Sequence, residues 1–242
     1  MSNVIRFIGD IHGDWETYRR DLISCDHKTL QVGDYGIFPY ATGNFLKVNE
    51  DGDFYYSHEP EHQDETKPIK WFYRIDHQYV KSLSTDNEKD RFIRGNHDDP
   101  FSIKLIPGYV DDGSLVFDSI FCVGGASSID KAFRREGVDW WRDEELSYSE
   151  SLIVLQKYLK TKPDIVVSHD CPDFLTYIIC PNMTRDGASS TRTLLSRMFE
   201  MYKPKLWVHG HWHISARNII DGCEFISLGI NEIFDFDVDT LK

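Results

Sequence analysis

Residues 4–14 read VIRFIGDIHGD, an apolar run that ends abruptly in a polar cluster. A run this short and this rich in branched apolar residues is typical of a buried β-strand rather than of a helix. Asp10 follows directly after Gly9, with His12 two residues later, and glycine tolerates the sharp turn that a chain makes on leaving a strand. The stretch therefore predicts a strand whose carboxyl end presents carboxylate and imidazole groups.

The same pattern recurs four times further along the chain. Apolar runs at 29–32, 91–93, 165–167 and 206–208 lead into Gly33-Asp34, Gly95-Asn96-His97-Asp98, Ser168-His169-Asp170 and His209-Gly210-His211-Trp212-His213. Helix-length stretches separate several of these runs, and we expect helices over 15–24, 68–84, 148–160 and 190–202. Alternating strands and helices predict an α/β sheet, in which sites form at the carboxyl ends of the strands. Segments 112–127 and 216–228 lack helices and are expected to form hairpins or meanders.

One segment, 38–67, does not fit this alternation because its periodicity is weak and it is rich in acidic residues. Two interpretations are open: a solvated surface excursion, or a flap over the site, since the segment leaves the chain directly after Asp34. A chain of 242 residues is long enough to bury a substantial core. We therefore expect one domain over residues 1–242, with 38–67 as an insertion or flap within it.

The composition limits the class of protein. Lys and Arg number 27 against 40 Asp and Glu, so the formal net charge is −13, which disfavours stable binding to duplex nucleic acid. The five cysteines are scattered without Cys-x-x-Cys pairing, which predicts neither a disulfide framework nor a zinc knuckle and fits a reducing cytoplasm. No apolar run approaches the roughly 20 residues of a membrane span, and no secretory signal is evident at the N-terminus. We expect a soluble cytoplasmic protein.

The five polar clusters together predict a metal site. Any one of them would be weak evidence, because a lone histidine in a core is usually structural. In an α/β sheet, however, the five strand ends converge on one rim. Carboxylate, amide oxygen and imidazole donors without thiolate suit hard or borderline divalent ions, with manganese expected and iron, nickel and zinc as alternatives.

The order and identity of these clusters resemble the calcineurin-like metallophosphoesterase superfamily, in particular its small stand-alone bacterial and phage members. The superfamily pattern is Asp-x-His, Gly-Asp, Gly-Asn-His-Asp or -Glu, a single His, and Gly-His-x-His. All five motifs occur here in that order, over nearly the whole chain. The resemblance implies a four-layer α/β/β/α sandwich in which two mixed sheets face each other and helices lie outside.

The resemblance also implies roles for the motif residues. Asp10, His12 and His213 would hold a first divalent cation, Asn96, His169 and His211 a second, and Asp34 would bridge the two. Two cations about 3.5 to 4 Å apart can share a hydroxide that attacks phosphorus in line with the leaving group.

Three further residues lie beside these ligands in the sequence. His97 follows Asn96 and would protonate or stabilise the leaving oxygen. For Asp98, two roles stay open, which are orienting His97 and forming a turn. His209 is interpreted as structural.

The chain departs from the Ser/Thr protein phosphatases of this superfamily after the second motif. Those enzymes extend it to Gly-Asp-x-Val-Asp-Arg-Gly, whereas Ile37 replaces the Asp and Phe38 replaces the phosphate-binding Arg here. Loss of a bidentate guanidinium contact is a large change for a monoester site. Within 124–135, Arg134 or Arg135 could contact phosphate instead, and a solvated basic pair is an equal alternative.

Other candidates are weaker. Trp140 and Trp141 are interpreted as core or lid packing rather than as base-stacking residues, and Arg192 and Lys131 are minor candidates for substrate contacts. We expect a hydrolase of phosphate diesters or monoesters acting on small nucleotides or cyclic nucleotides. A protein phosphatase acting on Ser, Thr or Tyr and a non-catalytic metal-binding scaffold are the alternatives.

Overall fold

The computed structural model describes residues 3–37, 45–48, 54–57, 88–134, 136–137, 140–181 and 188–241. In chain order, the strands are β1 (Val4–Ile8), β2 (Lys28–Gln31), β3 (Phe45–Val48), β4 (Phe54–Ser57), β5 (Asp90–Phe92), β6 (Ser114–Val116), β7 (Ile120–Val123), β8 (Ile165–Ser168), β9 (Leu206–His209), β10 (Ala216–Ile220), β11 (Cys223–Ser227) and β12 (Ile233–Asp237). The α-helices are α1 (Trp15–Thr17), α3 (Tyr148–Thr161), α4 (Asp173–Ile179) and α5 (Ser190–Met201). A π-helical turn, η1 (Tyr18–Leu22), and the 3-10 turns η3 (Ile103–Leu105), η4 (Lys131–Phe133) and η5 (Val238–Leu241) complete the set.

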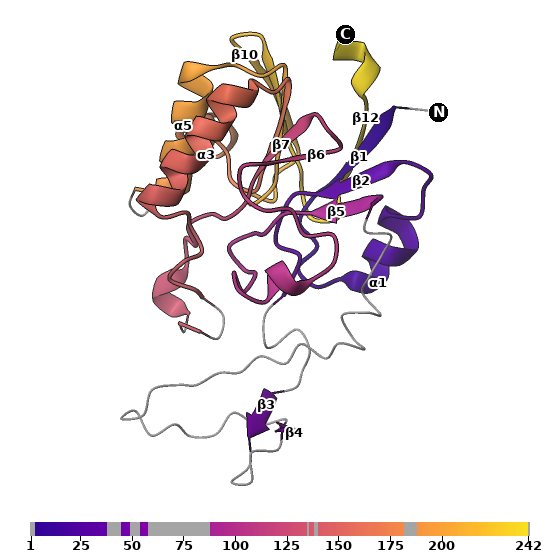
Figure 1. Ribbon diagram of the computed structural model, residues 1–242, viewed down its shortest axis with the longest axis vertical. Coiled ribbons are helices and arrows are strands. Elements are labelled where there is room, and N and C mark those ends of the chain that lie inside the picture. The colour runs from indigo at the N-terminus through magenta and orange to yellow at the C-terminus, as the bar shows by residue number, and fades with distance from the viewer. Residues whose placement is uncertain are drawn as a thin grey trace.

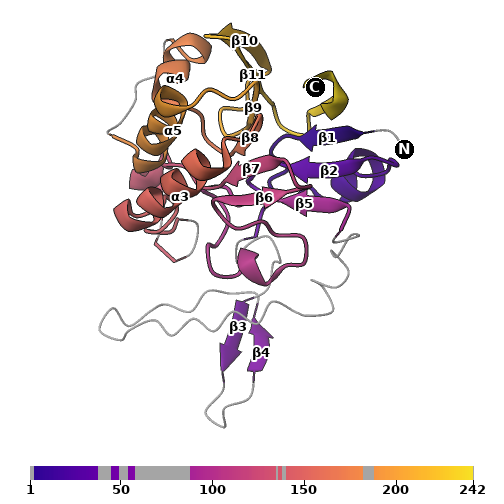
Figure 2. The same cartoon turned by 45° about the horizontal axis from the view of Figure 1, so that its top comes forward.

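The described strands form two mixed sheets and a separate hairpin. One sheet has the order β12-β1-β2-β5, the other β10-β11-β9-β8-β7-β6, and β3 pairs only with β4. Within the first sheet β1, β2 and β5 are parallel, and within the second β7, β8, β9 and β11 are parallel. Antiparallel strands β12, β10 and β6 lie at the edges (Figures 1 and 2). The parallel strands of each sheet thus end at a common edge.

The two sheets pack face to face through one apolar layer. Alternate residues of each strand enter this layer, as Ile165 and Val167 of β8 do, while Val166 between them faces the other side. Ile5 and Phe7 of β1 meet them from the opposite sheet. A fully buried apolar side chain of this size stabilises a fold by about 1.5–3 kcal/mol. The continuous apolar runs of the sequence therefore reflect strands buried on both faces.

Helices cover the outer face of each sheet. α3, α4 and α5 lie over the larger sheet, where Tyr158, Leu175 and Leu195 pack against Phe121 and Trp207 (Figures 1 and 2). On the smaller sheet, α1 and η1 pack with η3 over the outer face of β1 and β5. The predicted four-layer sandwich is confirmed. Within the described part of the chain, none of the helices combines the length and apolar composition of a membrane span.

Most predicted elements occur, and three differ from the prediction. The helix expected over 15–24 is instead the three residues of α1 followed by the π-helical η1. α4 and β12 were not predicted. The helix expected over 68–84 lies outside the described residues, as does most of the insertion or flap expected at 38–67, where only the backbone of β3 and β4 is described.

The N-terminus of α3 carries a capping box that allows a direct test of local stability. Ser147 Oγ accepts the backbone N–H of Glu150 at 3.3 Å, and the Glu150 carboxylate accepts the backbone N–H of Ser147 at 2.9 Å. The Ser147 hydroxyl also donates to the Glu150 carboxylate at 2.6 Å, and this bond, followed by that of the Ser147 backbone N–H, lowers the pKa of Glu150. We expect Ser147→Ala to lower the free energy of unfolding by about 1 kcal/mol at pH 7.

The effect of Ser147→Ala should depend on pH. Because the pKa of Glu150 is lower in the folded state, its contribution is fully present above the unfolded pKa and is lost as the pH falls through the folded pKa. The difference between wild type and variant in urea unfolding should therefore shrink in acid. Gln156→Ala, at an exposed site within the same helix, is the control and should stay within a few tenths of 1 kcal/mol. A pH-independent difference would contradict the capping-box interpretation.

Candidate metal centre

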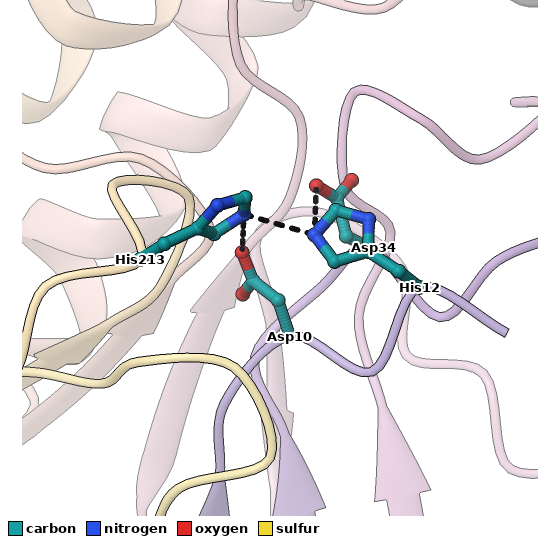
Figure 3. Close-up of side chains that lie close together, drawn as sticks. All are labelled: Asp10, His12, Asp34 and His213. Atoms are coloured by element: carbon teal, nitrogen blue, oxygen red, sulfur yellow. Dashed lines mark hydrogen bonds and ion pairs between the residues drawn. The ribbon is translucent and has the colours of Figure 1, made fainter. Parts of the chain in front are cut away.

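Four of the predicted ligands meet at one end of the sheets. Asp10 and His12 follow β1, Asp34 follows β2, and His213 follows β9 (Figure 3). Their ligand atoms all lie within 4.8 Å of one another. His213 Nε2 is 3.2 Å from Asp10 Oδ2, His12 Nε2 is 3.8 Å from Asp34 Oδ2, and the two histidine Nε2 atoms are 2.9 Å apart. We refer to this set as the first cluster.

A second cluster shares Asp34 with the first. Asp34, His169 and His211 place their ligand atoms within 4.8 Å of one another. His169 Nε2 lies 3.4 Å from Asp34 Oδ1 and 3.1 Å from Asn96 Oδ1, so the amide oxygen of Asn96 faces the same point. The structure therefore brings together all seven predicted ligands in the two groups that the sequence resemblance implies.

The backbone at these positions is strained. His12, Asp34, His211 and His213 have φ between 45° and 66°, a left-handed conformation that is uncommon for residues other than glycine. Such conformations cost about 1–3 kcal/mol each and cluster at functional sites, where the surrounding structure must compensate. Four of them among seven candidate ligands indicate that the fold holds these side chains inward at a cost in stability.

Three glycines that precede ligands are required by the ligands of other strands. A Cβ at Gly33 would overlap the imidazole of His169, and one at Gly95 or Gly210 would overlap the carboxylate of Asp34 or Asp10. Their absent side chains therefore let the clusters from different strands approach closely. Gly33 has in addition a φ of 111°, which a residue with a side chain rarely adopts.

The electrostatics of the centre reflect buried charges in close contact. Burial opposes the charged forms of both Asp34 and His169, but the pair stabilise each other: the pKa of Asp34 is held well below its usual range and that of His169 is raised to about 10. Burial lowers the pKa of His211 and of the less buried His12. At His213, the hydrogen bond with Asp10 raises the pKa.

The donor atoms fit divalent cations. Nδ1 of His169 lies 3.0 Å from the Val32 carbonyl oxygen, which can only accept, so Nδ1 carries a proton, and Nε2 presents a lone pair whenever the ring is neutral. That lone pair faces the oxygens of Asn96 and Asp34, and three acceptors facing one another require a cation or an extra proton between them. Oδ1 of fully buried Asp10 likewise has no hydrogen-bond partner among the described residues. Nitrogen and oxygen donors without sulfur suit the ions predicted from the sequence.

His97 and Asp98 occupy different environments. The His97 ring is partly exposed beside the centre, with Nε2 3.9 Å from Asp34 Oδ2, and its backbone N–H donates to Asp34 Oδ1 at 2.9 Å. Asp98 is fully buried and accepts four backbone N–H groups, those of Tyr35, Gly36, Ile37 and Gly95. Desolvation and the charge of Asp34 raise the pKa of Asp98 to about 6. Of the two roles left open for Asp98, these contacts favour holding the turn.

Arg134 lies against His97. Its Nη1 donates to His97 Nδ1 at 2.8 Å, and its Nε and Nη2 contact the Asp130 carboxylate at 2.6 and 2.7 Å. The hydrogen bond with Arg134 lowers the pKa of Asp130. Arg135 lies outside the described residues.

None of the other described candidates is a member of either cluster. Trp141 is buried, Lys131 is exposed, and Arg192 is buried in ion pairs with Asp170 and Asp173. His209 is fully buried with its pKa lowered to about 4 by burial.

Residues that support the ligands were not identified from the sequence. Ser128 and Glu144 form hydrogen bonds that lead to Asn96, and Asp130 holds Arg134. A further carboxylate, Asp170, accepts the indole N–H of Trp212, the residue between His211 and His213, at 2.9 Å. Nothing in the spacing of these residues distinguishes them from ordinary surface or turn residues.

Comparison with known proteins places the chain in a family of phosphoesterases. The sequence model of the calcineurin-like phosphoesterases matches residues 4–215, and the chain belongs to this family. No curated protein sequence matches the chain.

Several solved structures resemble it, among them the two that follow. TT1561 of Thermus thermophilus has a TM-score of 0.51 at 10% identity, over 98% of this chain and 100% of that one, which shows a shared fold. A putative 5'-nucleotidase from Staphylococcus aureus in complex with alpha-ketoglutarate has a TM-score of 0.47 at 11% identity, over 96% of this chain and 50% of that one.

Proposed function

We propose that this protein is a dinuclear metal-dependent phosphoesterase that hydrolyses small phosphate esters, with nucleotides and cyclic nucleotides as its substrates. The observation that carries the proposal is the position of Asp34, which belongs to both ligand clusters. A carboxylate shared between two sets of nitrogen and oxygen donors suits a pair of divalent cations. Manganese is the cation proposed, with iron, nickel and zinc as alternatives.

Each residue of the centre has a proposed task. Asp10, His12 and His213 would hold one cation and Asn96, His169 and His211 the other, with Asp34 between them. Bound there, the cations would supply an activated water-derived nucleophile and offset the charge of the phosphoryl oxygens.

His97 would donate a proton or hydrogen bond to the leaving oxygen. Arg134 always donates, and its shorter contact with the ring, 2.8 Å from Nη1 to Nδ1, makes His97 Nδ1 the acceptor. The ring proton then lies on Nε2, which is 3.4 Å from Arg134 Nη2 and 3.9 Å from the shared carboxylate of Asp34. Arg134 therefore orients His97 toward the centre, a task that the resemblance had assigned to a carboxylate.

The charges around the centre favour diesters over monoesters. The guanidinium of Arg134, which the sequence suggested as a phosphate contact, is held in two contacts with Asp130. Its charge is thus largely offset before a substrate binds. Ile37, at the position of the protein-phosphatase carboxylate, is buried and apolar. A phosphodiester carries one negative charge fewer than a monoester and needs less compensation.

A substrate panel with Mn²⁺, run on the wild type and on His97→Ala, tests the function. We expect hydrolysis of a 2′,3′-cyclic nucleotide to exceed that of a nucleoside monophosphate and of a phosphopeptide. His97→Ala should slow esters with poor leaving groups by about 10²- to 10⁴-fold, the usual contribution of a general acid, and activated aryl esters much less. His27→Ala is the control, because His27 precedes β2 and thus lies at the opposite end of that strand.

Three results would contradict the proposal in different ways. Faster hydrolysis of the phosphopeptide would favour a protein phosphatase. Equal losses on poor and activated leaving groups would remove the proton-donor role from His97. Metal-loaded protein that hydrolyses none of these esters at any pH would favour a metal-binding scaffold.

The cellular setting is also proposed. We infer that residues 1–242 form one domain and act in the cytoplasm, with small phosphoesters rather than membranes or duplex nucleic acid as partners. All five cysteines are free, and four of them are buried, which suits a reducing compartment. The net charge of −13 supports the absence of a duplex nucleic-acid partner.

A further inference from the structure

Asn96 differs from the other candidate ligands because its two ends have opposite chemistry. The amide oxygen can bind a cation, whereas the NH₂ group only donates hydrogen bonds. If the amide of Asn96 were flipped, its NH₂ group would take the place of its oxygen. The second cluster would then lose a ligand, and N–H donors would face the cation. Some part of the protein must select the orientation that presents the oxygen.

A buried chain of hydrogen bonds makes this selection. Asn96 Nδ2 donates to Ser128 Oγ at 3.0 Å, and Ser128 Oγ lies 2.5 Å from Glu144 Oε2. The backbone N–H of Ser128 donates to Glu144 Oε1 at 2.9 Å. Asn96, Ser128 and Glu144 are 2%, 4% and 3% exposed, so water does not offer alternative partners.

The donor and acceptor roles in this series of hydrogen bonds follow from the chemistry of Glu144, its last residue. Burial raises the pKa of Glu144, and the two donors of Ser128 oppose that rise. In its ionised form the carboxylate can only accept, and it receives both the N–H and the O–H of Ser128. Since the hydroxyl has one proton, which it gives to Glu144, its oxygen must accept from Asn96. Only the NH₂ group can donate to it, and Asn96 Oδ1 is left facing His169 Nε2 at 3.1 Å.

The loop that carries Glu144 is itself fixed relative to Asn96. Arg94, two residues before Asn96, donates through Nη1 to the carbonyl oxygens of Asp143 and Glu144 at 3.1 and 3.0 Å. The same guanidinium pairs with Asp112 at 3.0 Å. Arg94 thus ties the end of β5 to the loop before α3, and the backbone of Glu144 cannot shift without breaking these contacts.

We infer that Ser128 and Glu144 are positioning residues that hold the amide of Asn96 with its oxygen toward the second metal site. The inference rests on the proposed dinuclear centre. It assigns them no contact with substrate. Loss of either residue should lower the affinity of the second site for its cation by about 10- to 100-fold, as is usual for partners that orient metal ligands. The first cation, held by Asp10, His12 and His213, should bind as before.

Two variants interrupt this series of hydrogen bonds in different ways. Ser128→Ala removes the middle member, and Glu144→Gln keeps the shape of the last member but adds a donor that can reverse the direction. Glu145→Gln is a matched control: the neighbouring Glu145 also accepts a serine hydroxyl and a backbone N–H, those of Ser189 and Thr191, but it contacts no candidate ligand.

The binding of Mn²⁺ to metal-free protein, measured by titration calorimetry, gives the number and affinity of sites without any turnover. The electron paramagnetic resonance spectrum distinguishes a coupled pair of Mn²⁺ ions from a single one. We expect two sites in the wild type and in Glu145→Gln. In Ser128→Ala and Glu144→Gln, we expect one unchanged site, a second about 10- to 100-fold weaker, and the spectrum of a single ion at low metal.

A double variant separates positioning from general damage to the fold. Asn96→Asp provides oxygen at both ends of the side chain, so its orientation no longer matters. Combined with Ser128→Ala, it should restore the second site that Ser128→Ala alone weakens. A wild type with two sites and single variants that keep both affinities would overturn the inference and leave the proposed function intact. A wild type that binds fewer than two Mn²⁺ ions would overturn both.

Discussion

Replacing Asp34 with asparagine is expected to lower phosphoester hydrolysis by more than about 100-fold, beyond the upper end of the losses seen for outer-shell partners of a metal site. The reason is that Asp34 belongs to both ligand clusters. Its Oδ1 faces His169 Nε2 and its Oδ2 faces His12 Nε2, at 3.4 and 3.8 Å. Asparagine has the same volume but only one oxygen, so one of the two sites must face an NH₂ group.

Metal affinity checks this expectation independently of turnover. Added Mn²⁺ should raise the free energy of unfolding of the wild-type protein, by about 2.7 kcal/mol for each site at a concentration 100 times its Kd. Asp34→Asn should gain much less, and titration should show that at least one site is lost. Asp90→Asn, a buried carboxylate at the start of β5 and so at the opposite end of that strand, is the control and should retain both sites. Two sites of unchanged affinity in Asp34→Asn would show that Asp34 is not shared.

The strands of the two main sheets were largely predictable because a strand that is buried on both faces usually appears in the sequence as a short apolar run. The runs at 165–167 and 206–208 match β8 and β9 to within one residue. How the strands divide between two sheets was not predictable from the runs, since a short, largely apolar run does not indicate which sheet it joins. That division came from the family resemblance.

The elements that sequence reasoning missed or mistook are short or irregular. α4 spans two turns, too few to establish a helical period, and α1 passes into η1 after one turn. Over so few residues, the apolar positions Trp15, Tyr18 and Leu22 fit an α-helix and a π-helix about equally. β12 had a usable signal: Phe234 and Phe236 alternate with aspartates and pack at the core between the sheets.

The candidate ligands were predictable from the sequence, whereas the residues that hold them in place were not. A ligand set must combine particular residue types directly after a strand, and this leaves motifs such as Gly-Asn-His-Asp. Ser128 contacts Asn96 across 32 positions of the sequence and Glu144 contacts Ser128 across 16, and both need only donate or accept in the right direction. Many residues could satisfy that requirement at many spacings. Only the three-dimensional contacts reveal them.

Asp98→Ala should cause the largest loss of stability of the changes considered. The carboxylate is fully buried and accepts the N–H groups of Tyr35, Gly36, Ile37 and Gly95 at 2.7–3.0 Å. Removing it leaves four buried donors without their acceptor, and an unsatisfied buried group costs about 1–3 kcal/mol before relaxation. Because water can enter and the loop can relax, we expect a total of about 3–5 kcal/mol, a large share of the 5–15 kcal/mol typical of a domain.

Urea unfolding, followed by tryptophan fluorescence in metal-free protein, measures this loss without contributions from bound cations. The neighbouring Asp99→Ala is the control: Asp99 is also buried, but its described partners, Ser102 and Phe101, are close in sequence and outside the centre. It should cost less than Asp98→Ala. If Asp98 served chiefly to orient His97, Asp98→Ala would instead retain its stability and lose turnover selectively on poor leaving groups. Because the Asp98 carboxylate directs both oxygens at backbone N–H groups of two loops, and Arg134 already occupies His97 Nδ1, we expect the stability loss.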